Sequence, residues 1–273
     1  MSEMKNAVGA GTGRSGDDLC AGNSVREFKI WADVLNYGKK ILKNAGIVEA
    51  DLDAWYLFEQ SFGISRAQYF LCARENIVGS TAQKMTAQEQ TGNSLESKNA
   101  LDCVELWLKE KLSAYENALK KRVARIPLQQ ILGSQEFMGL EFFVNEHVLI
   151  PRQDTEILVE EVLKELHDGM RVLDMCTGSG CILLSLLHYS NACEGLGVDL
   201  SAEALEVAGR NVLKVLTPEK AEHAYFLQSD LFEKVEGKFE IIVSNPPYIA
   251  SAEVEKLMPE VRDHEPRMAL DGT

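Results

Sequence analysis

Short apolar runs alternate with amphipathic segments from residue 154 onward, and this alternation constrains the fold more than any other feature of the chain. Four runs have the length and composition of buried strands, namely 171–176, 195–200, 224–231 and 239–244. Residues 154–168 have helical spacing with Asp154 or Thr155 as the predicted cap, and Ser201 is the predicted cap of a later helix. Strands that alternate with helices predict a parallel, doubly wound α/β sheet, which binds ligands beyond the carboxyl ends of its strands.

The first half of the chain predicts helices instead. Residues 1–23 are rich in Gly and Ser and are expected to form a disordered tail. The Gly-x-Gly-x-x-Gly pattern at 11–16 follows no strand and opens no helix, so it predicts no dinucleotide site. A capping box formed by Ser24 and Glu27 predicts the first helix of a helical domain over 24–125. Further helices are predicted at 49–62, 65–74 and 98–125, with a loop or frayed helix over 79–100.

A change of composition then marks a linker between two domains. Residues that favour β-structure surround Gly133 and Gly139, which predicts a short β-hairpin linker over 126–153. The α/β domain is expected to occupy residues 154–273.

Charge, hydropathy and cysteine spacing disfavour several classes of function. No apolar run approaches the roughly 18 residues of a membrane helix, and the N-terminus lacks a signal-like apolar core, so we expect a cytoplasmic protein. The net charge is −14, of which −12 falls in residues 150–273. Because basic side chains supply much of the affinity for phosphates, this acidity disfavours direct nucleic-acid binding. The six cysteines and five histidines show no metal-ligand spacing, so neither a metal site nor a disulfide framework is predicted.

Unusual residues follow three of the predicted strands. A tight turn of small residues, 174–181, ends the first strand and leads into a helix whose N–H groups are free to face a ligand. Asp199 ends the second strand, where a carboxylate can accept both hydroxyls of a ribose, and Asp230 ends the third. No Gly-Lys-Ser/Thr follows the turn, which argues against a P-loop. The combination favours a nucleoside-containing cofactor over a Gly-rich turn without a ligand.

The fourth strand ends in Asn245, Pro246, Pro247 and Tyr248. Proline removes two N–H donors and holds the preceding residue extended, so a stiff, outward turn is predicted. The side-chain oxygen of Asn245 and the carbonyl of Pro246 are then two neighbouring acceptors, which suit both hydrogens of a planar –NH2 group. Holding that nitrogen favours the tetrahedral geometry needed for attack on a methyl group, and Tyr248 offers an aromatic face for packing.

These motifs resemble those of the class I S-adenosylmethionine-dependent methyltransferases, and more narrowly the HemK-type family that methylates glutamine in peptide chain release factors. The resemblance covers about residues 24–273, and its motifs lie at 174–180, 197–201, 229–232, 244–249, 150–156 and 265–272. Asn-Pro-Pro-Tyr is shared with adenine and other amino methyltransferases, whereas the motifs at 150–156 and 265–272 are specific to the glutamine branch. The resemblance implies a Rossmann-like class I methyltransferase domain behind the helical bundle and the hairpin.

The resemblance also implies the roles of individual residues. The methionine part of S-adenosylmethionine would lie against Cys176, Thr177, Gly178, Ser179 and Gly180, the ribose against Asp199, and the adenine between Asp230 and Leu231, with Asn245 beside the cofactor. Asn245, Pro246, Pro247 and Tyr248 would bind the glutamine, with Asn245, Pro246 and Tyr248 as the catalytic residues. The helical domain would recognise the release factor, whose glutamine lies in a Gly-Gly-Gln loop.

The chain departs from the family pattern at two places. Cys176 replaces the first glycine of the cofactor loop, which is tolerable if its φ is negative. The chain ends at Thr273, where the family continues with a further helix and the last strands of the sheet. We therefore expect an incomplete sheet with the strand before Asn245 at its edge, and little activity from residues 1–273 alone.

Three other functions remain open at this stage. The first is methylation of a ribosomal-protein glutamine. The second is adenine methylation of DNA or RNA, which the acidity disfavours. The third is an inactive remnant that only binds a partner through its helical domain.

Overall fold

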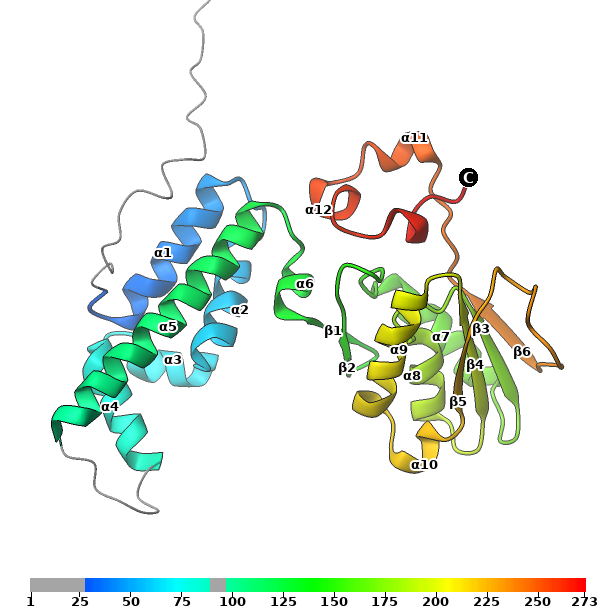
Figure 1. Ribbon diagram of the computed structural model, residues 1–273, viewed down its shortest axis with the longest axis horizontal. Helices are drawn as coiled ribbons and strands as arrows, with labels where there is room; N and C mark the ends of the chain where they lie inside the picture. The colour runs from blue at the N-terminus through cyan, green and yellow to red at the C-terminus, as the bar shows by residue number, and fades with distance from the viewer. Residues whose placement is uncertain (1–27, 89–96) are drawn as a thin grey trace, which may run out of the picture.

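The computed structural model describes residues 28–88 and 97–273 (Figure 1). The predicted tail over 1–23 and the Ser24–Glu27 capping box lie outside the described residues. The helical domain consists of α1 (Trp31–Asn44), α2 (Ala50–Phe62), α3 (Arg66–Cys72), α4 (Ile77–Gln88) and α5 (Ser97–Val123). Of the predicted loop or frayed helix over 79–100, residues 79–88 belong to α4, which packs against α5, and residues 97–100 begin α5.

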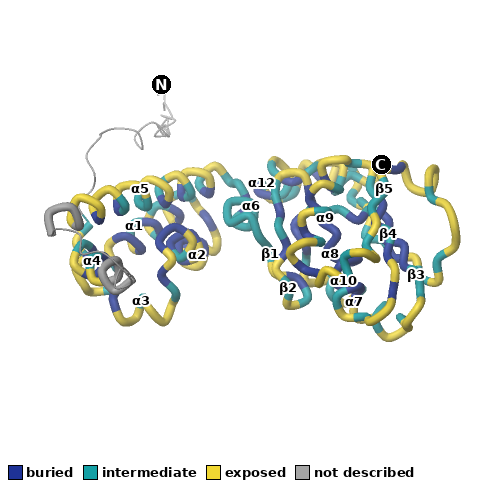
Figure 2. Tube along the Cα trace, turned by 60° about the horizontal axis from the view of Figure 1, so that its bottom comes forward, coloured by how far each residue is buried: buried dark blue, intermediate teal, exposed yellow. Residues whose placement is uncertain are grey.

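An aromatic core holds the helical domain together. Phe58 lies edge-on to Trp31 and to Tyr115, with ring centroids 5.9 and 6.1 Å apart, and all three rings are buried. A Cβ atom at Gly38 would lie 1.9 Å from the Tyr115 hydroxyl, so glycine lets α1 approach α5 closely. Figure 2 shows this core and a second, separate core in the α/β domain.

The linker contains a helical turn as well as the predicted hairpin. α6 (Leu128–Leu132) begins after Pro127 and ends at Gly133, which adopts φ 73°. β1 (Ser134–Phe137) and β2 (Leu140–Phe143) then pair antiparallel, with Ser134 opposite Phe143. The sequence prediction missed α6 because Pro127 and Gly133 delimit too short a segment for helical periodicity to show.

The second half forms the predicted parallel α/β sheet. Its strands, β3 (Arg171–Met175), β4 (Glu194–Asp199), β5 (Ala224–Gln228) and β6 (Ile241–Ser244), lie in the order β5-β4-β3-β6. The helices α7 (Asp154–Glu165), α8 (Cys181–Tyr189) and α9 (Ala202–Val215), with the short α10 (Pro218–Ala221), lie to one side of the sheet in Figure 1. In β3, Val172 packs with α8 in one core cluster and Leu173 belongs to another, as period-2 alternation requires.

The predicted helix caps and strand ends agree with the structure in part. Ser201 caps α9 as predicted, with its Oγ accepting a hydrogen bond from the N–H of Ala204 at 3.0 Å. The N-cap of α7 is Gln153, without a side-chain cap, so the prediction of Asp154 or Thr155 was wrong. β5 ends at Gln228, which places Asp230 two residues beyond the strand, in the following turn.

Within the described residues β6 is an edge strand, as expected, and Ile242 is 57% exposed. The chain then runs through α11 (Ser251–Val254), α12 (Pro259–Arg262) and the 3₁₀ turn η2 (Arg267–Ala269). In Figure 1 this segment lies above the sheet, with α12 toward the helical domain. Among the residues that the structure describes, no helix is long and apolar enough to cross a membrane.

Candidate cofactor and acceptor site

A pocket of about 440 Å³ lies at the carboxyl ends of the strands, within the usual size range of small-molecule sites. It is lined by ten of the residues predicted from the sequence: Cys176, Thr177, Gly178, Ser179, Asp199, Asp230, Leu231, Asn245, Pro246 and Pro247. Gly180 and Tyr248 do not line it. Gly180 adopts φ 76° and forms the N-cap of α8, so it shapes the turn from behind the pocket.

The backbone conformation of Cys176 differs from the one expected from the sequence. Its φ is +61°, so the expectation of a negative φ was wrong. The strand-to-helix turn requires a left-handed residue at this position, which for a side chain with a Cβ costs about 1–2 kcal/mol. Burial raises the pKa of the Cys176 thiol, and the nearby carboxylates of Asp199 and Asp174 raise it further, so the thiol is neutral at pH 7.

Asp199 holds the turn in place. Its Oδ2 accepts a hydrogen bond from the N–H of Gly178 at 2.9 Å, and its Oδ1 accepts one from the N–H of Ser201 at 3.0 Å. Each carboxylate oxygen has a further lone pair, so the same side chain can still accept hydroxyl donors from the pocket. The location therefore suits the predicted contact with a ribose.

Asp174 is a site residue to which the sequence reasoning assigned no role. It is fully buried; its Oδ2 accepts a hydrogen bond from the Thr177 hydroxyl at 2.7 Å, while its Oδ1 has no partner. Burial raises its pKa to about 7, against the lowering effect of the hydrogen bonds from Thr177 and Leu183, and Asp199 adds to the rise. Asp174 does not itself line the pocket; its bond to Thr177 supports the turn that does. The signal was an acidic residue inside an apolar strand run.

Leu231 borders the pocket beside Asp230 in a strained conformation. Its φ is +47°, which is uncommon for a bulky side chain, and the side chain is 53% exposed. Its position places apolar surface at the rim of the pocket, which suits a flat aromatic base.

Residues 245–248, which we call the acceptor turn, follow directly after β6. The Ser244 hydroxyl donates to the carbonyl of Met175 at 2.7 Å, which ties the end of β6 to β3. Asn245 and Pro247 are half-buried and line the pocket, as does Pro246. Tyr248, by contrast, is 79% exposed and outside the lining, so the structure does not bring its ring to the predicted packing position.

Polar side chains outside the predicted set also position the pocket. The Asn211 amide nitrogen donates to the carbonyls of Ser179 at 2.9 Å and Phe143 at 3.0 Å, which joins the cofactor turn to the hairpin. Arg152 lines the pocket and donates to Glu265 Oε1 at 2.6 Å. Both residues of this pair lie in motifs noted in the sequence, but their pairing across 113 residues could not be predicted.

Comparisons with known proteins found matches to both halves of the chain. Residues 152–261 match the methyltransferase small domain, and residues 33–88 match the PrmC N-terminal domain. The release factor glutamine methyltransferase of Caulobacter vibrioides is 34% identical over 237 residues, which cover 86% of this chain and 71% of that protein. The proteins of the same name from Geobacter sulfurreducens and Bradyrhizobium diazoefficiens are each 44% identical, over 60% and 56% of this chain and 56% and 52% of those proteins. The chain thus spans about half the length of these two curated relatives.

Proposed function

The chain belongs to the release factor glutamine methyltransferase family, and from this premise we propose that it transfers a methyl group from S-adenosylmethionine to the side-chain amide of a glutamine in a peptide chain release factor. The observation that carries the proposal is the meeting of two subsites in one pocket. The turn after β3 and Asp199 at the end of β4 line the same pocket as Asn245, Pro246 and Pro247 after β6.

The residues present fit S-adenosylmethionine. Asp199 suits the ribose hydroxyls, Leu231 suits the adenine, and the small residues Gly178 and Ser179 leave room for the methionine part. When bound, S-adenosylmethionine supplies an electrophilic methyl group on a positively charged sulfur. A neutral Cys176 thiol in the same turn adds no competing negative charge.

Asn245 and Pro246 would prepare the glutamine amide for attack. Their two oxygens accept the two N–H groups and fix the nitrogen in line with the methyl carbon, which supplies rate through alignment. The nitrogen lone pair forms the new C–N bond, the old C–S bond breaks with its electrons on sulfur, and one amide proton then leaves to water. No general base is required, because the proton becomes acidic only as the nitrogen gains its fourth bond.

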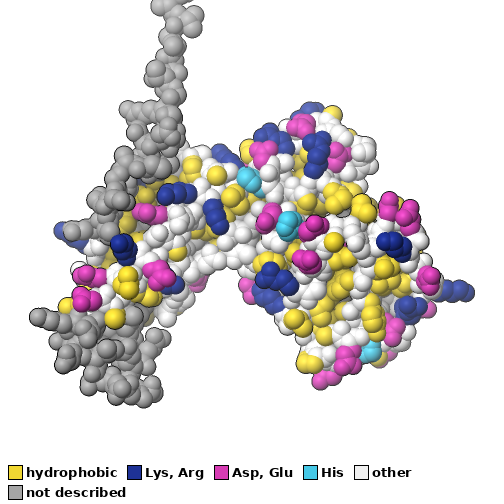
Figure 3. Space-filling view, in the orientation of Figure 1, with side chains coloured by type: hydrophobic (Ala, Val, Ile, Leu, Met, Phe, Trp, Pro, Cys, Tyr) yellow, Lys and Arg dark blue, Asp and Glu magenta, His cyan; other side chains and the backbone are white. Residues whose placement is uncertain are grey.

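A protein substrate suits the surface better than a nucleic acid. On the face shown in Figure 3, basic side chains are interleaved with acidic ones around the α/β domain. Residues 150–273 carry a net charge of −12, which repels phosphates at moderate salt. A release factor substrate places the reaction in the cytoplasm, where translation ends.

The direct test is to incubate the protein with labelled S-adenosylmethionine and a purified release factor, and to map the label by mass spectrometry. Whatever the rate of transfer, we expect the label on one glutamine of the Gly-Gly-Gln loop. Asn245→Ala should abolish the label, and Asn191→Ala, an exposed asparagine in the turn before β4, should not. Label in a ribosomal protein or in adenine would replace the proposal with that substrate, and no label with bound cofactor would indicate a binding protein.

A further inference from the structure

The last described segment of the chain, residues 258–273, contacts both the helical domain and the pocket. We call it the bridging segment; it contains α12 and η2. In Figure 1 its α12 end lies toward the helical domain, and its last residues lie over the sheet. Pro266, Met268 and Ala269 of this segment line the pocket.

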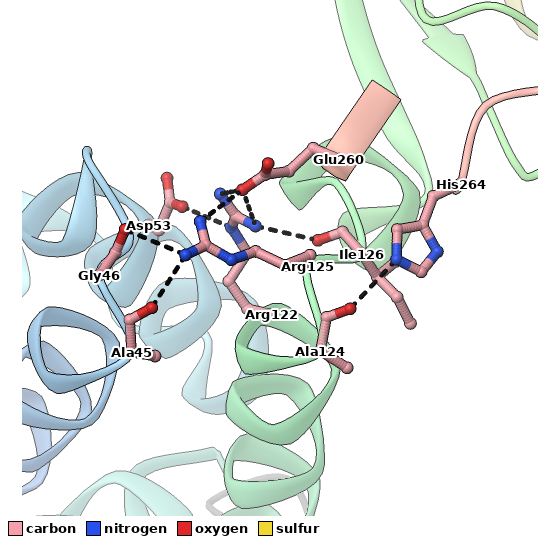
Figure 4. A network of polar contacts seen from close by, with 9 residues as sticks. All are labelled: Ala45, Gly46, Asp53, Arg122, Ala124, Arg125, Ile126, Glu260 and His264. Atoms are coloured by element: carbon pink, nitrogen blue, oxygen red, sulfur yellow. Dashed lines mark hydrogen bonds and ion pairs between the residues drawn. The ribbon is translucent and has the colours of Figure 1, made fainter. Parts of the chain in front are cut away.

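At the α12 end, Glu260 accepts hydrogen bonds from two arginines of the helical domain (Figure 4). Its Oε1 lies 3.1 Å from Nη1 and 3.2 Å from Nη2 of Arg122, and 3.2 Å from Nη1 of Arg125. Only 10% of the Glu260 side chain is exposed. These contacts join residues 135 and 138 positions apart in the chain.

The arginines are themselves fixed within the helical domain. Arg122 donates from Nε to Asp53 of α2 at 2.7 Å, and Arg125 donates from Nη2 to the carbonyls of Ala45 and Gly46 at 3.0 and 3.3 Å. The cluster contains two cations and two anions and is largely buried, so loss of Glu260 would leave an unbalanced buried charge. A second link to the helical domain is His264, whose Nε2 lies 3.1 Å from the carbonyl oxygen of Ala124. Gln130 of the linker helix α6 donates from Nε2 to the carbonyl of His264 at 2.9 Å.

At its other end the bridging segment packs behind the acceptor turn. Ile249, the residue after the acceptor turn, forms two backbone hydrogen bonds with the bridging segment. The N–H of Gly272 donates to the carbonyl of Ile249, and the N–H of Ile249 donates to the carbonyl of Leu270, each at 3.0 Å. A Cβ atom at Gly272 would lie 2.7 Å from the Pro247 carbonyl oxygen. Between the two ends, Glu265 is paired with the pocket residue Arg152.

We infer that Glu260 is a positioning residue: it fixes the helical domain against the bridging segment, so that a protein held by the helical domain presents its glutamine to the acceptor turn. The inference rests on the proposed function. It predicts that Glu260 matters for an intact protein substrate, which engages both domains, and not for a short peptide, which engages only the pocket.

The kinetic test compares an intact release factor with a Gly-Gly-Gln peptide as substrates of Glu260→Gln and Glu260→Ala. We expect kcat/KM for the intact protein to fall about 10- to 100-fold in Glu260→Ala and less in Glu260→Gln, which keeps one acceptor oxygen. The value for the peptide, and the affinity for S-adenosylmethionine by calorimetry, should stay within about twofold. Glu253→Gln is the matched control, because Glu253 lies in the neighbouring α11 and forms an exposed ion pair with Lys256. Equal losses for both substrates would overturn the inference, as would no loss for either.

A structural measurement keeps the inference separate from the proposed function. Small-angle scattering should show a larger radius of gyration for Glu260→Ala than for the unmodified chain or Glu253→Gln, and thermal unfolding should split into two steps. If the unmodified chain transfers no methyl group, the proposed function fails while scattering still decides the role of Glu260. Unchanged scattering together with a single unfolding step in Glu260→Ala would overturn the positioning role.

Discussion

Replacement of Asp174 by Asn should stabilise the ligand-free protein above neutral pH. The pKa of Asp174 is raised from its ordinary value of 3.8 to about 7, first of all because the side chain is buried. Between these two pH values the folded chain holds a proton that the unfolded chain has lost. Stability from this group is therefore fully present below pH 3.8 and is lost as the pH rises through about 7.

The size of the effect follows from the two pKa values. Each pKa unit corresponds to about 1.36 kcal/mol, so the full loss is about 4 kcal/mol for the change from 3.8 to about 7. Between pH 5 and pH 8 the experimentally accessible part is about 3 kcal/mol. Asn keeps the shape and cannot ionise, so the variant should lack this decline. Its Thr177 contact can persist, with the Asn side-chain oxygen as acceptor.

The assay is urea unfolding of the ligand-free protein at pH 5, 6, 7 and 8. The difference in unfolding free energy between Asp174→Asn and the unmodified chain should rise by about 3 kcal/mol across this range. Asp168→Asn, an exposed carboxylate of the same domain, is the control and should show no such rise. If the unfolding free energies of Asp174→Asn and the unmodified chain changed with pH in the same way, Asp174 would not have the raised pKa assigned to it.

Three further predictions concern the rest of the pocket. Asn245→Ala should lower kcat by about 100-fold or more and leave cofactor affinity nearly unchanged, since it removes one of two acceptors for the amide; near-normal turnover would contradict this role. Asp199→Ala should weaken S-adenosylmethionine binding by about 1–3 kcal/mol by calorimetry, and more than Asp230→Ala, because Asp230 is exposed; equal effects would reassign the ribose contact. Cys176→Gly should be more stable to urea than Cys176→Ala by about 1 kcal/mol, because only glycine adopts φ +61° without strain; the reverse order would mean that the turn relaxes in both.

The features that could be predicted from the sequence are those set by local pattern. Alternating apolar runs gave the parallel sheet, and the serine before an amphipathic helix gave the cap of α9 at Ser201. The residues at the strand ends gathered in one pocket because parallel strands bring their carboxyl ends to the same edge. The helix α6 was not predicted, because its five residues are too few to show helical periodicity.

Features set by tertiary context could not be predicted. The φ of Cys176 depends on how the turn meets α8, and the exposure of Tyr248 depends on the path that the chain takes after the two prolines. The role of Asp174 depends on complete burial of one carboxylate oxygen, which no local pattern encodes. Each of these is a property of the folded neighbourhood and not of the residue type.

The acceptor turn illustrates how the two kinds of information combine. Asn245 and the prolines define two acceptors by local chemistry alone, and among the described residues β6 pairs with β3. The bridging segment supplies further support, because Gly272 has no Cβ and its backbone can pack directly against the Pro247 carbonyl. That same segment is fixed at its far end by Glu260 and the two arginines of the helical domain. Alignment of the amide therefore depends on residues of both domains, although the chemistry uses only the turn.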